Sequence, residues 1–163
     1  MTDKELYKKL AYKTRNVYQT LTPEEKRTML DMCDEYRNFL DNGKTERECV
    51  RSAVAMAESN GFVPFNTKNE LKPGDRVYMI NRKKNILLAV IGTEDIDNGI
   101  NIVGAHIDSP RLDLKQNPLY QSKEMALLKT HYYGGIKKYQ WTALPLAIHG
   151  VCYTKGGEQV EIC

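Results

Sequence analysis

The sequence lacks a long hydrophobic run, which excludes a membrane-spanning helix. No apolar stretch among the 163 residues approaches the roughly 20 that a helical span needs. The N-terminus, Met-Thr-Asp-Lys-Glu, lacks the apolar region of a signal peptide, so none is expected. These two absences predict a protein of the cytoplasm without membrane contact. There is also no Ser- or Gly-rich linker, no repeat and no low-complexity tract.

The sequence also lacks a large excess of positive or negative residues, which argues against nucleic acid as a partner. The net charge is +3 and the charged residues are interspersed along the chain. The single short basic run, Arg82-Lys83-Lys84, falls between two expected strands. We therefore interpret it as a solvated hairpin tip and expect no nucleic-acid partner.

Paired cysteines are missing as well. The chain has four cysteines, Cys33, Cys49, Cys152 and Cys163, and no two stand as C-x-x-C. Their irregular spacing fits neither a zinc knuckle nor the disulfide framework of a secreted protein. Cys33 has apolar neighbours at helical spacing and is expected to be a buried thiol. Cys163 is expected to be an exposed, oxidisable thiol.

Helical signals fill residues 3–42. Leu6, Leu10, Val17 and Leu21 form a loose apolar stripe at the start. A second helix has Thr22 as N-cap, Pro23 at its first position and Glu25 in place for a capping box. The expected inner face of this helix carries Met29, Cys33, Tyr36 and Leu40. Asp41-Asn42-Gly43 is expected to end it.

A third helix follows with the same start signal. Thr45 and Glu48 form its capping box, and Gly61 supplies the left-handed residue that commonly ends a helix. Its buried side chains are expected to be Val50, Ala53, Val54 and Ala57. All these apolar stripes are interpreted as hydrophobic core and not as cofactor contacts.

Strand signals begin after Phe62. Arg76–Asn81 and Asn85–Ile91 are expected to form a hairpin, and the continuously apolar Leu87–Ile91 predicts a strand covered on both faces. The acidic loop Glu94–Gly99 has the Asp-x-Asp look of a calcium loop but lacks the downstream glutamate. Ile100–Ala105 is expected to be the next strand.

Beyond Pro110 the pattern is looser. Arg111–Lys115 alternates like a strand and Asn117-Pro118 is expected to turn. After a short apolar patch at residues 126–128, Gln140–Tyr153 and Gln159–Ile162 are expected to be strands. Lys155-Gly156-Gly157 is a hairpin signal for the last two.

The buried strand expected at Ile100–Ala105 ends in His106-Ile107-Asp108, which suggests a metal ligand. A neutral imidazole can bind a metal, and a carboxylate two residues away can fix its tautomer, as acids behind zinc-bound histidines do. The alternative is a capped or half-exposed histidine without a ligand role.

The surrounding residues carry a resemblance. Gly104-Ala105-His106-Ile107-Asp108-Ser109-Pro110, followed by Tyr133-Gly134-Gly135 and Trp141, resembles the M18 family of zinc aminopeptidases. The resemblance implies that His106 is the first zinc ligand and Asp108 the acid that orients it. It also implies two metals, zinc or alternatively cobalt or manganese, with further ligands and a glutamate base downstream. His131 and His149 do not match ligand motifs.

The resemblance also implies a fold. The implied fold is α/β, with N-terminal helices packed on a mixed sheet as in zinc peptidases. The beginning of a β-rich dimerisation domain, which is inserted into the peptidase domain, follows. Residues 1–115 are then the first part of the peptidase domain, and residues 125–163 the start of the insert. Peptide substrates and a homo-oligomer are the expected partners.

Three functions remain open. The chain is the N-terminal segment of an aminopeptidase, inactive alone because ligands are missing; or a binding or oligomerisation domain derived from one; or an unrelated small enzyme that uses His106, Asp108 and His131. The typical aspartyl-specific sequence is absent, since Ile136 replaces a third glycine and residues 142–146 carry no acidic cluster. Arg111 either pairs with a substrate carboxylate or forms a salt bridge with Asp113 or another neighbour.

Overall fold

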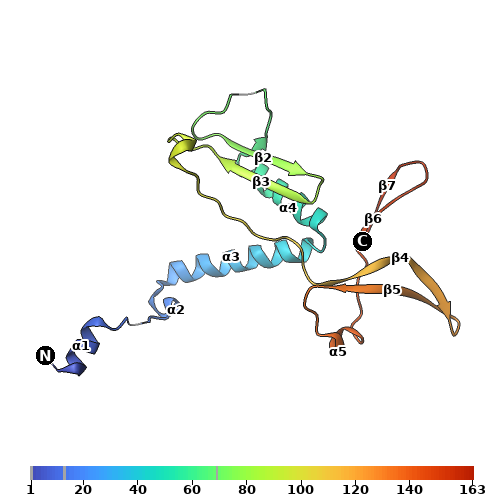
Figure 1. Ribbon diagram of the computed structural model, residues 1–163, viewed down its shortest axis with the longest axis horizontal. Helices are drawn as coiled ribbons and strands as arrows, with labels where there is room; N and C mark the ends of the chain where they lie inside the picture. Colours follow the sequence, from blue (N-terminus) through green and yellow to red (C-terminus); the bar gives the residue numbers. More distant parts are fainter. Residues whose placement is uncertain (1, 13, 69) are drawn as a thin grey trace. The chain divides into compact units, whose positions relative to one another are not determined.

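The first part of the chain is a series of helices. The computed structural model describes residues 2–12, 14–68 and 70–163, and it divides into two units, Met1–Asn38 and Phe39–Cys163. Unit 1 holds α1 (Asp3–Leu10), α2 (Val17–Thr20) and most of α3 (Pro23–Asn42) (Figure 1). The predicted capping box of α3 is confirmed, since Glu25 accepts from Thr22 N at 2.7 Å and Thr22 Oγ1 accepts from Glu25 N at 3.2 Å. The predicted end of α3 before Gly43 is also confirmed.

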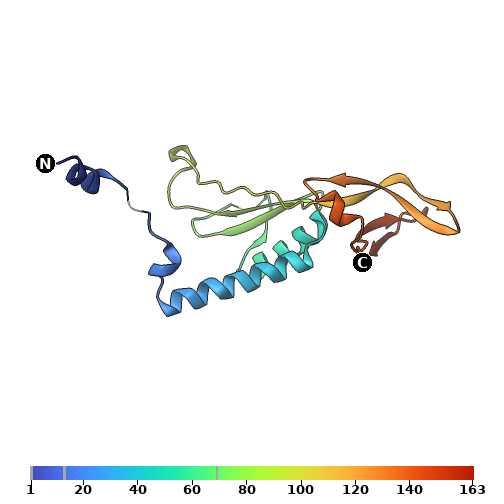
Figure 2. The ribbon, with the colours of Figure 1, turned by 90° about the horizontal axis from the view of Figure 1, so that it is seen from below.

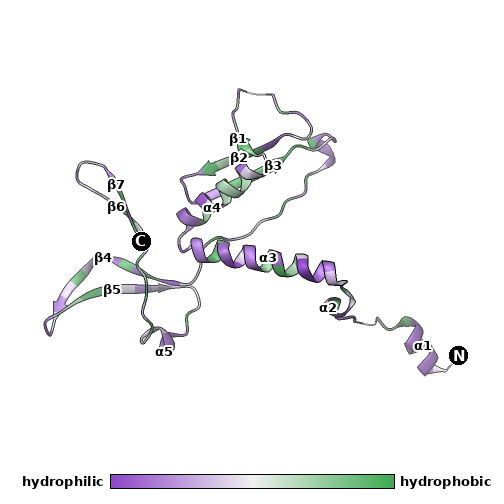
Figure 3. Cartoon of the chain, turned by 180° about the vertical axis from the view of Figure 1, so that it is seen from behind, coloured by the Kyte–Doolittle hydropathy of each residue, from purple (hydrophilic) through white to green (hydrophobic). Residues whose placement is uncertain are grey.

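The predicted core along these helices is wrong. None of the described residues of α1, α2 or α3 is buried, and α1 and α3 are mainly hydrophilic in Figure 3. Cys33 is exposed, as are Tyr36 and Leu40, while Met29 is half-buried. An apolar stripe is buried only when a second element packs on it. Among the described residues, neither α1 nor α2 packs extensively on α3, so the stripe stays largely uncovered.

Unit 2 has its core under α4 (Glu46–Ser59). The predicted capping box is present, with Thr45 Oγ1 accepting from Glu48 N and Glu48 accepting from Thr45 N at 2.7 Å. The helix ends before Gly61, whose φ of +79° is the predicted left-handed conformation. One face of α4 packs on strands β2 and β3 (Figure 2). The buried side chains are Cys49, Val50, Ala57, Val77 and Tyr78.

The sheet of unit 2 contains the predicted hairpin. Its order is β1 (Val63–Pro64), β2 (Arg76–Asn81) and β3 (Asn85–Val90), with β1 parallel to β2 and β2 antiparallel to β3. Arg82 and Lys83 form the tip with φ of +52° and +60°, as the basic run predicted. The prediction that β3 is covered on both faces is wrong, because Leu87 is 54% exposed and Val90 is 61% exposed. The strand lies at the sheet edge and α4 covers one face only.

The predicted strand at Ile100–Ala105 is also wrong. After the 3₁₀ turn η1 (Ile96–Asn98), residues 99–110 have no regular secondary structure. The side chain of Val103 is 98% exposed and that of Ile102 79%. A strand exists only where a neighbour pairs with its backbone, and no described residue pairs with this segment. His106 therefore lies on an irregular segment and not at the end of a buried strand.

The remaining strands form two separate hairpins. β4 (Arg111–Ser122) pairs with β5 (Met125–Tyr133) as a long twisted ribbon (Figure 2). Residues 123 and 124 make the turn, whereas Asn117-Pro118 lies within β4, where the register shifts between Leu114 and Leu119. The turn predicted at Asn117-Pro118 is therefore wrong. Proline cannot donate to a ladder, and here it coincides with an irregularity in the pairing.

The last segment is partly helical. The strand predicted over Gln140–Tyr153 is wrong at its start, where it overlaps the end of α5 (Lys138–Trp141), and only Gly150–Tyr153 forms a strand, β6. β6 pairs with β7 (Gln159–Ile162) through the predicted glycine turn. The fold is a mixed α/β arrangement of helices and small sheets. None of its described helices is both long and apolar enough to cross a membrane.

Candidate functional site

The two sequence motifs of the candidate site pack against each other. Pro110 follows the His106–Ser109 segment, and Gly134 follows β5 in the Tyr-Gly-Gly motif. A Cβ on Gly134 would lie 3.3 Å from Pro110 Cα, and the φ of Gly134 is +73°. Both observations favour glycine at this position. Cys49 Sγ lies 3.5 Å from the carbonyl oxygen of Ile107, which joins the same segment to α4.

His106 and Asp108 are in contact. His106 Nδ1 lies 2.9 Å from the backbone oxygen of Asp108 and 3.1 Å from its Oδ1. A backbone carbonyl only accepts hydrogen bonds, so Nδ1 carries the hydrogen. The lone pair of the neutral ring then lies on Nε2, and the side chain is 84% exposed. The arrangement leaves Nε2 available to an incoming ligand.

The second oxygen of Asp108 has its own partner. Tyr133 Oη donates a 2.6 Å hydrogen bond to Asp108 Oδ2. This bond, with smaller contributions from the backbone and His106, holds the pKa of Asp108 below its ordinary value. The same bond raises the pKa of Tyr133. Asp108 is thus kept ionised and able to accept from both sides.

Sequence reasoning placed Tyr133 in a motif but missed its contact with Asp108. The only signal was the motif itself, which does not say which residue the tyrosine meets.

Arg111 is occupied by acidic partners within the chain. Its Nε lies 2.7 Å from Asp113 Oδ1, and its Nη2 lies 3.1 Å from Glu46 Oε1. The guanidinium also stacks over the Tyr133 ring, 4.3 Å from the centroid. The salt-bridge interpretation of Arg111 is confirmed, and it links β4 to the first turn of α4.

His131 is not joined to the His106–Asp108 pair. It lies on β5 opposite Asp113, with its ring 5.5 Å from that of Tyr132. Within the described residues, no third histidine, cysteine or acid groups with His106 and Asp108 to form a metal-sized cluster. The small-enzyme hypothesis therefore lacks the third ligand it needs.

A different set of donors meets elsewhere in unit 2. Glu48, His149 and Cys163 place one ligand atom each within 4.8 Å of one another. Glu48 already uses both oxygens, since Oε2 caps α4 through Thr45 and Oε1 lies 3.0 Å from His149 Nδ1. The Glu48 carboxylate in this group therefore serves as a helix cap and as the partner of His149. Sequence reasoning missed this group, because Glu48 and His149 are far apart in the chain.

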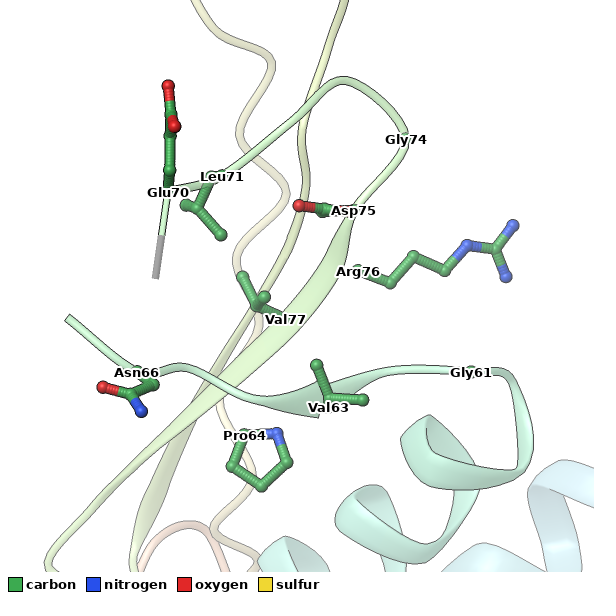
Figure 4. Close-up of a pocket in the computed structure, with 10 residues that line it drawn as sticks. All are labelled: Gly61, Val63, Pro64, Asn66, Glu70, Leu71, Gly74, Asp75, Arg76 and Val77. Atoms are coloured by element: carbon green, nitrogen blue, oxygen red, sulfur yellow. The ribbon is translucent and has the colours of Figure 1, made fainter. Parts of the chain in front are cut away.

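A hollow of about 350 Å³ lies beside β1 and the start of β2 (Figure 4). Two of its polar side chains have partners within the chain: Asp75 accepts from Lys72 N at 2.8 Å, and Arg76 donates to the Asn60 carbonyl at 2.8 Å. Arg76 extends away from the other labelled side chains. The residues that line the hollow include neither a histidine nor a cysteine.

Comparison with known proteins identifies the family of the chain. Residues 39–162 match the family model of the aminopeptidase I zinc metalloproteases (M18). A protein of Clostridium acetobutylicum named probable M18 family aminopeptidase 1 is 48% identical over 91% of this chain and 33% of its own length. A protein of the same name from Borrelia garinii is 44% identical over 92% of this chain and 33% of its own.

Solved structures agree with the sequence match. The crystal structure of aminopeptidase I from Borrelia burgdorferi superposes with a TM-score of 0.86 at 42% identity, covering 91% of this chain and 37% of that one. An M18 aminopeptidase from Thermotoga maritima gives 0.82 at 41% identity, covering 93% and 33%. The chain thus spans about a third of the length of the curated relatives it matches. It belongs to the M18 family of zinc metallopeptidases.

Proposed function

We propose that this chain supplies the N-terminal part of a zinc aminopeptidase that removes N-terminal residues from peptides. In this proposal His106 is the first zinc ligand and Asp108 the acid that orients it. The two-metal centre, its other ligands and the general base belong to polypeptide that this chain does not include. The isolated chain is then inactive.

The observation that carries the proposal is the contact of His106 Nδ1 with two oxygens of Asp108. Both oxygens can only accept, so this contact places the hydrogen on Nδ1 and leaves the lone pair on Nε2. Neutral imidazole is a standard zinc ligand, and the acid behind it raises its basicity. The donor set of this chain therefore fits one zinc position, with one ligand and its orienting acid. Bound zinc supplies a water of lowered pKa and polarises a carbonyl.

Family membership supports the larger architecture. Helix α4 and the β1–β3 sheet are proposed as the first layers of the peptidase domain, residues 1–115, and residues 125–163 as the start of the dimerisation domain. The hairpin β4–β5 contains the proposed boundary. A homo-oligomer and a cytoplasmic location remain part of the proposal.

The test uses a chimera. Residues 1–162 replace the matching first third of the Borrelia burgdorferi aminopeptidase I, and the product is assayed on a panel of aminoacyl p-nitroanilides after zinc loading. We expect hydrolysis by the chimera, its loss with His106→Ala, and none by the isolated chain. His131→Ala is the matched control and should keep activity. A folded chimera in which His106→Ala leaves zinc content and turnover unchanged would contradict the proposal.

The alternative is a binding or oligomerisation domain without catalysis. If this alternative is correct, neither the isolated chain nor the chimera takes up zinc through His106. The zinc content of the chimera, measured with and without His106→Ala, separates the two functions independently of the substrate chosen.

A further inference from the structure

We propose that Tyr133 is a positioning residue that holds the Asp108 carboxylate in the orientation in which it aims His106. The inference rests on the proposed function of His106 as a zinc ligand. It gives a role to the tyrosine of the Tyr-Gly-Gly motif, which the sequence placed but did not explain.

Asp108 needs an external support. Its side chain has two rotatable bonds, and staggered rotamers place the carboxylate in quite different directions. Its partner on one side is His106, whose side chain is 84% exposed. On the other side, the 2.6 Å bond from Tyr133 fixes Oδ2 and so turns Oδ1 toward the imidazole. Tyr133 is therefore the partner of Asp108 that comes from regular secondary structure.

Tyr133 is itself well placed to serve as a support. It is the last residue of β5 and pairs with Arg111 in the register of the hairpin. The Arg111 guanidinium covers its ring and is anchored by Glu46 on α4 and by Asp113. The next residue, Gly134, approaches Pro110 closely and brings the strand end beside the Asp108 segment.

These contacts form a continuous path from the first turn of α4 to the imidazole. Glu46 holds Arg111, Arg111 covers Tyr133, and Tyr133 bonds to Asp108, which bonds to His106. The segment that carries His106 has no backbone pairing of its own. Side chains therefore replace the sheet as the means of placing the ligand.

Removing the hydroxyl has two opposite effects on the imidazole. The carboxylate becomes a stronger acceptor, which favours a hydrogen on Nδ1, but it also gains freedom to rotate away. The rotation dominates because a hydrogen bond requires direction as well as charge. A measurement of the Asp108 rotamer separates these effects, since only the loss of position changes it.

The experiment is NMR on the isotope-labelled 163-residue chain without metal, comparing wild type, Tyr133→Phe and the neighbouring control Tyr132→Phe. Three-bond couplings report Asp108 χ1, and ring nitrogen shifts report the His106 tautomer. We expect one χ1 rotamer in the wild type and averaging in Tyr133→Phe. We also expect the ratio of Nδ1-H to Nε2-H forms to fall about fivefold, the equivalent of one hydrogen bond. Tyr132→Phe should leave both values unchanged.

A folded Tyr133→Phe with the wild-type rotamer and tautomer overturns the proposal. If Tyr133→Phe does not fold, 3-fluorotyrosine at position 133 keeps the hydroxyl and serves instead. The chemical shift of its fluorine should change when Asp108→Asn is introduced and stay the same when Asp97→Asn is introduced. A fluorine shift that is unchanged by Asp108→Asn also overturns the proposal. Neither measurement uses zinc or substrate, so an inactive chimera and a failed Tyr133 test are distinguishable.

Discussion

His149 Nδ1 lies 3.0 Å from Glu48 Oε1, and this contact joins residues that are 101 positions apart in the chain. A second bridge lies one helical turn further along α4, where Arg51 Nη1 meets Glu161 Oε2 at 2.9 Å. Positions 48 and 51 lie on the same face of the helix. The segment that ends in hairpin β6–β7 is therefore fastened to the start of α4 by two polar contacts.

Glu48→Ala should destabilise unit 2, because it removes a helix cap and the partner of His149 together. We expect a loss of about 1–2 kcal/mol, the usual cost of a lost cap with one further hydrogen bond. Urea unfolding followed by circular dichroism measures it.

Two variants separate the parts of that effect. Glu48→Gln can still cap α4 and should lose less than Glu48→Ala. Glu25→Ala removes the equivalent capping residue from α3 and should also cost less than Glu48→Ala. Equal losses in Glu48→Ala and Glu25→Ala would mean that the His149 contact adds no stability.

The Glu48 contacts also predict a dependence of stability on acid. Burial raises the pKa of Glu48, but the hydrogen bonds from His149 and Thr45 outweigh it and bring the pKa below its ordinary value of 4.5. A group whose pKa is lowered by folding contributes its full stability above the unfolded pKa. That contribution disappears as pH falls through the lower, folded pKa.

The pH prediction is checked by urea midpoints measured from neutral pH down to below 4.5. The wild type should lose stability over the acid part of this range more steeply than His149→Asn. Asp108 and Glu25, whose pKa values are also lowered, give the same background in both proteins. Parallel curves would contradict the role of His149.

Arg111→Lys should be costly although it conserves charge. Lysine cannot reach Asp113 and Glu46 in the forked geometry of arginine, nor cover the Tyr133 ring as a flat group. Because Arg111 is partly exposed, we expect a loss of only about 1 kcal/mol in thermal or urea unfolding. Arg51→Lys is the control, since Arg51 is 60% exposed and pairs with one acid. A loss in Arg51→Lys as large as in Arg111→Lys would refute the distinction.

Gly43→Ala should destabilise the connection between α3 and α4. An added Cβ would lie 2.7 Å from Cys49 Sγ and 3.1 Å from the Phe39 carbonyl oxygen. Overpacking of this kind costs about 1–3 kcal/mol. Cys49→Ala removes the sulfur, so the double variant should lose less than the sum of the single ones. Additive losses would show that Sγ is not the obstacle.

The four cysteines should differ in reactivity toward iodoacetamide. Cys33, Cys152 and Cys163 are exposed and should be alkylated in the native protein. Cys49 is buried, and burial with the nearby carboxylates of Glu46 and Glu48 raises the pKa of its thiol. Mass spectrometry of tryptic peptides should find Cys49 labelled only after unfolding in urea. Rapid native labelling of Cys49 would contradict its placement.

Local signals explain what the sequence predicted well. A capping box spans three residues, so Thr22–Glu25 and Thr45–Glu48 were both predicted correctly. The hairpin of β2 and β3 was also found, because its turn lies between two apolar runs. The contact of His106 with Asp108 is similarly local, two residues apart in the chain.

Features that depend on distant residues were not predicted. Whether Ile100–Ala105 forms a strand depends on a neighbour, and composition does not report one. Tyr133 reaches Asp108 through the register of a long hairpin with a shift in the middle, which no short pattern encodes. Cys33 has a helical apolar neighbourhood, but burial also requires an element to pack on that face.

The absence of backbone pairing around His106 has a dynamic consequence. Residues 100–110 lie in no described helix or strand, so their amide protons lie at the low end of protection against exchange with solvent. The segment can open locally while β2 and β3 stay folded. Occupancy by a ligand that binds only the closed form would slow that exchange, so the loop itself becomes a reporter of binding.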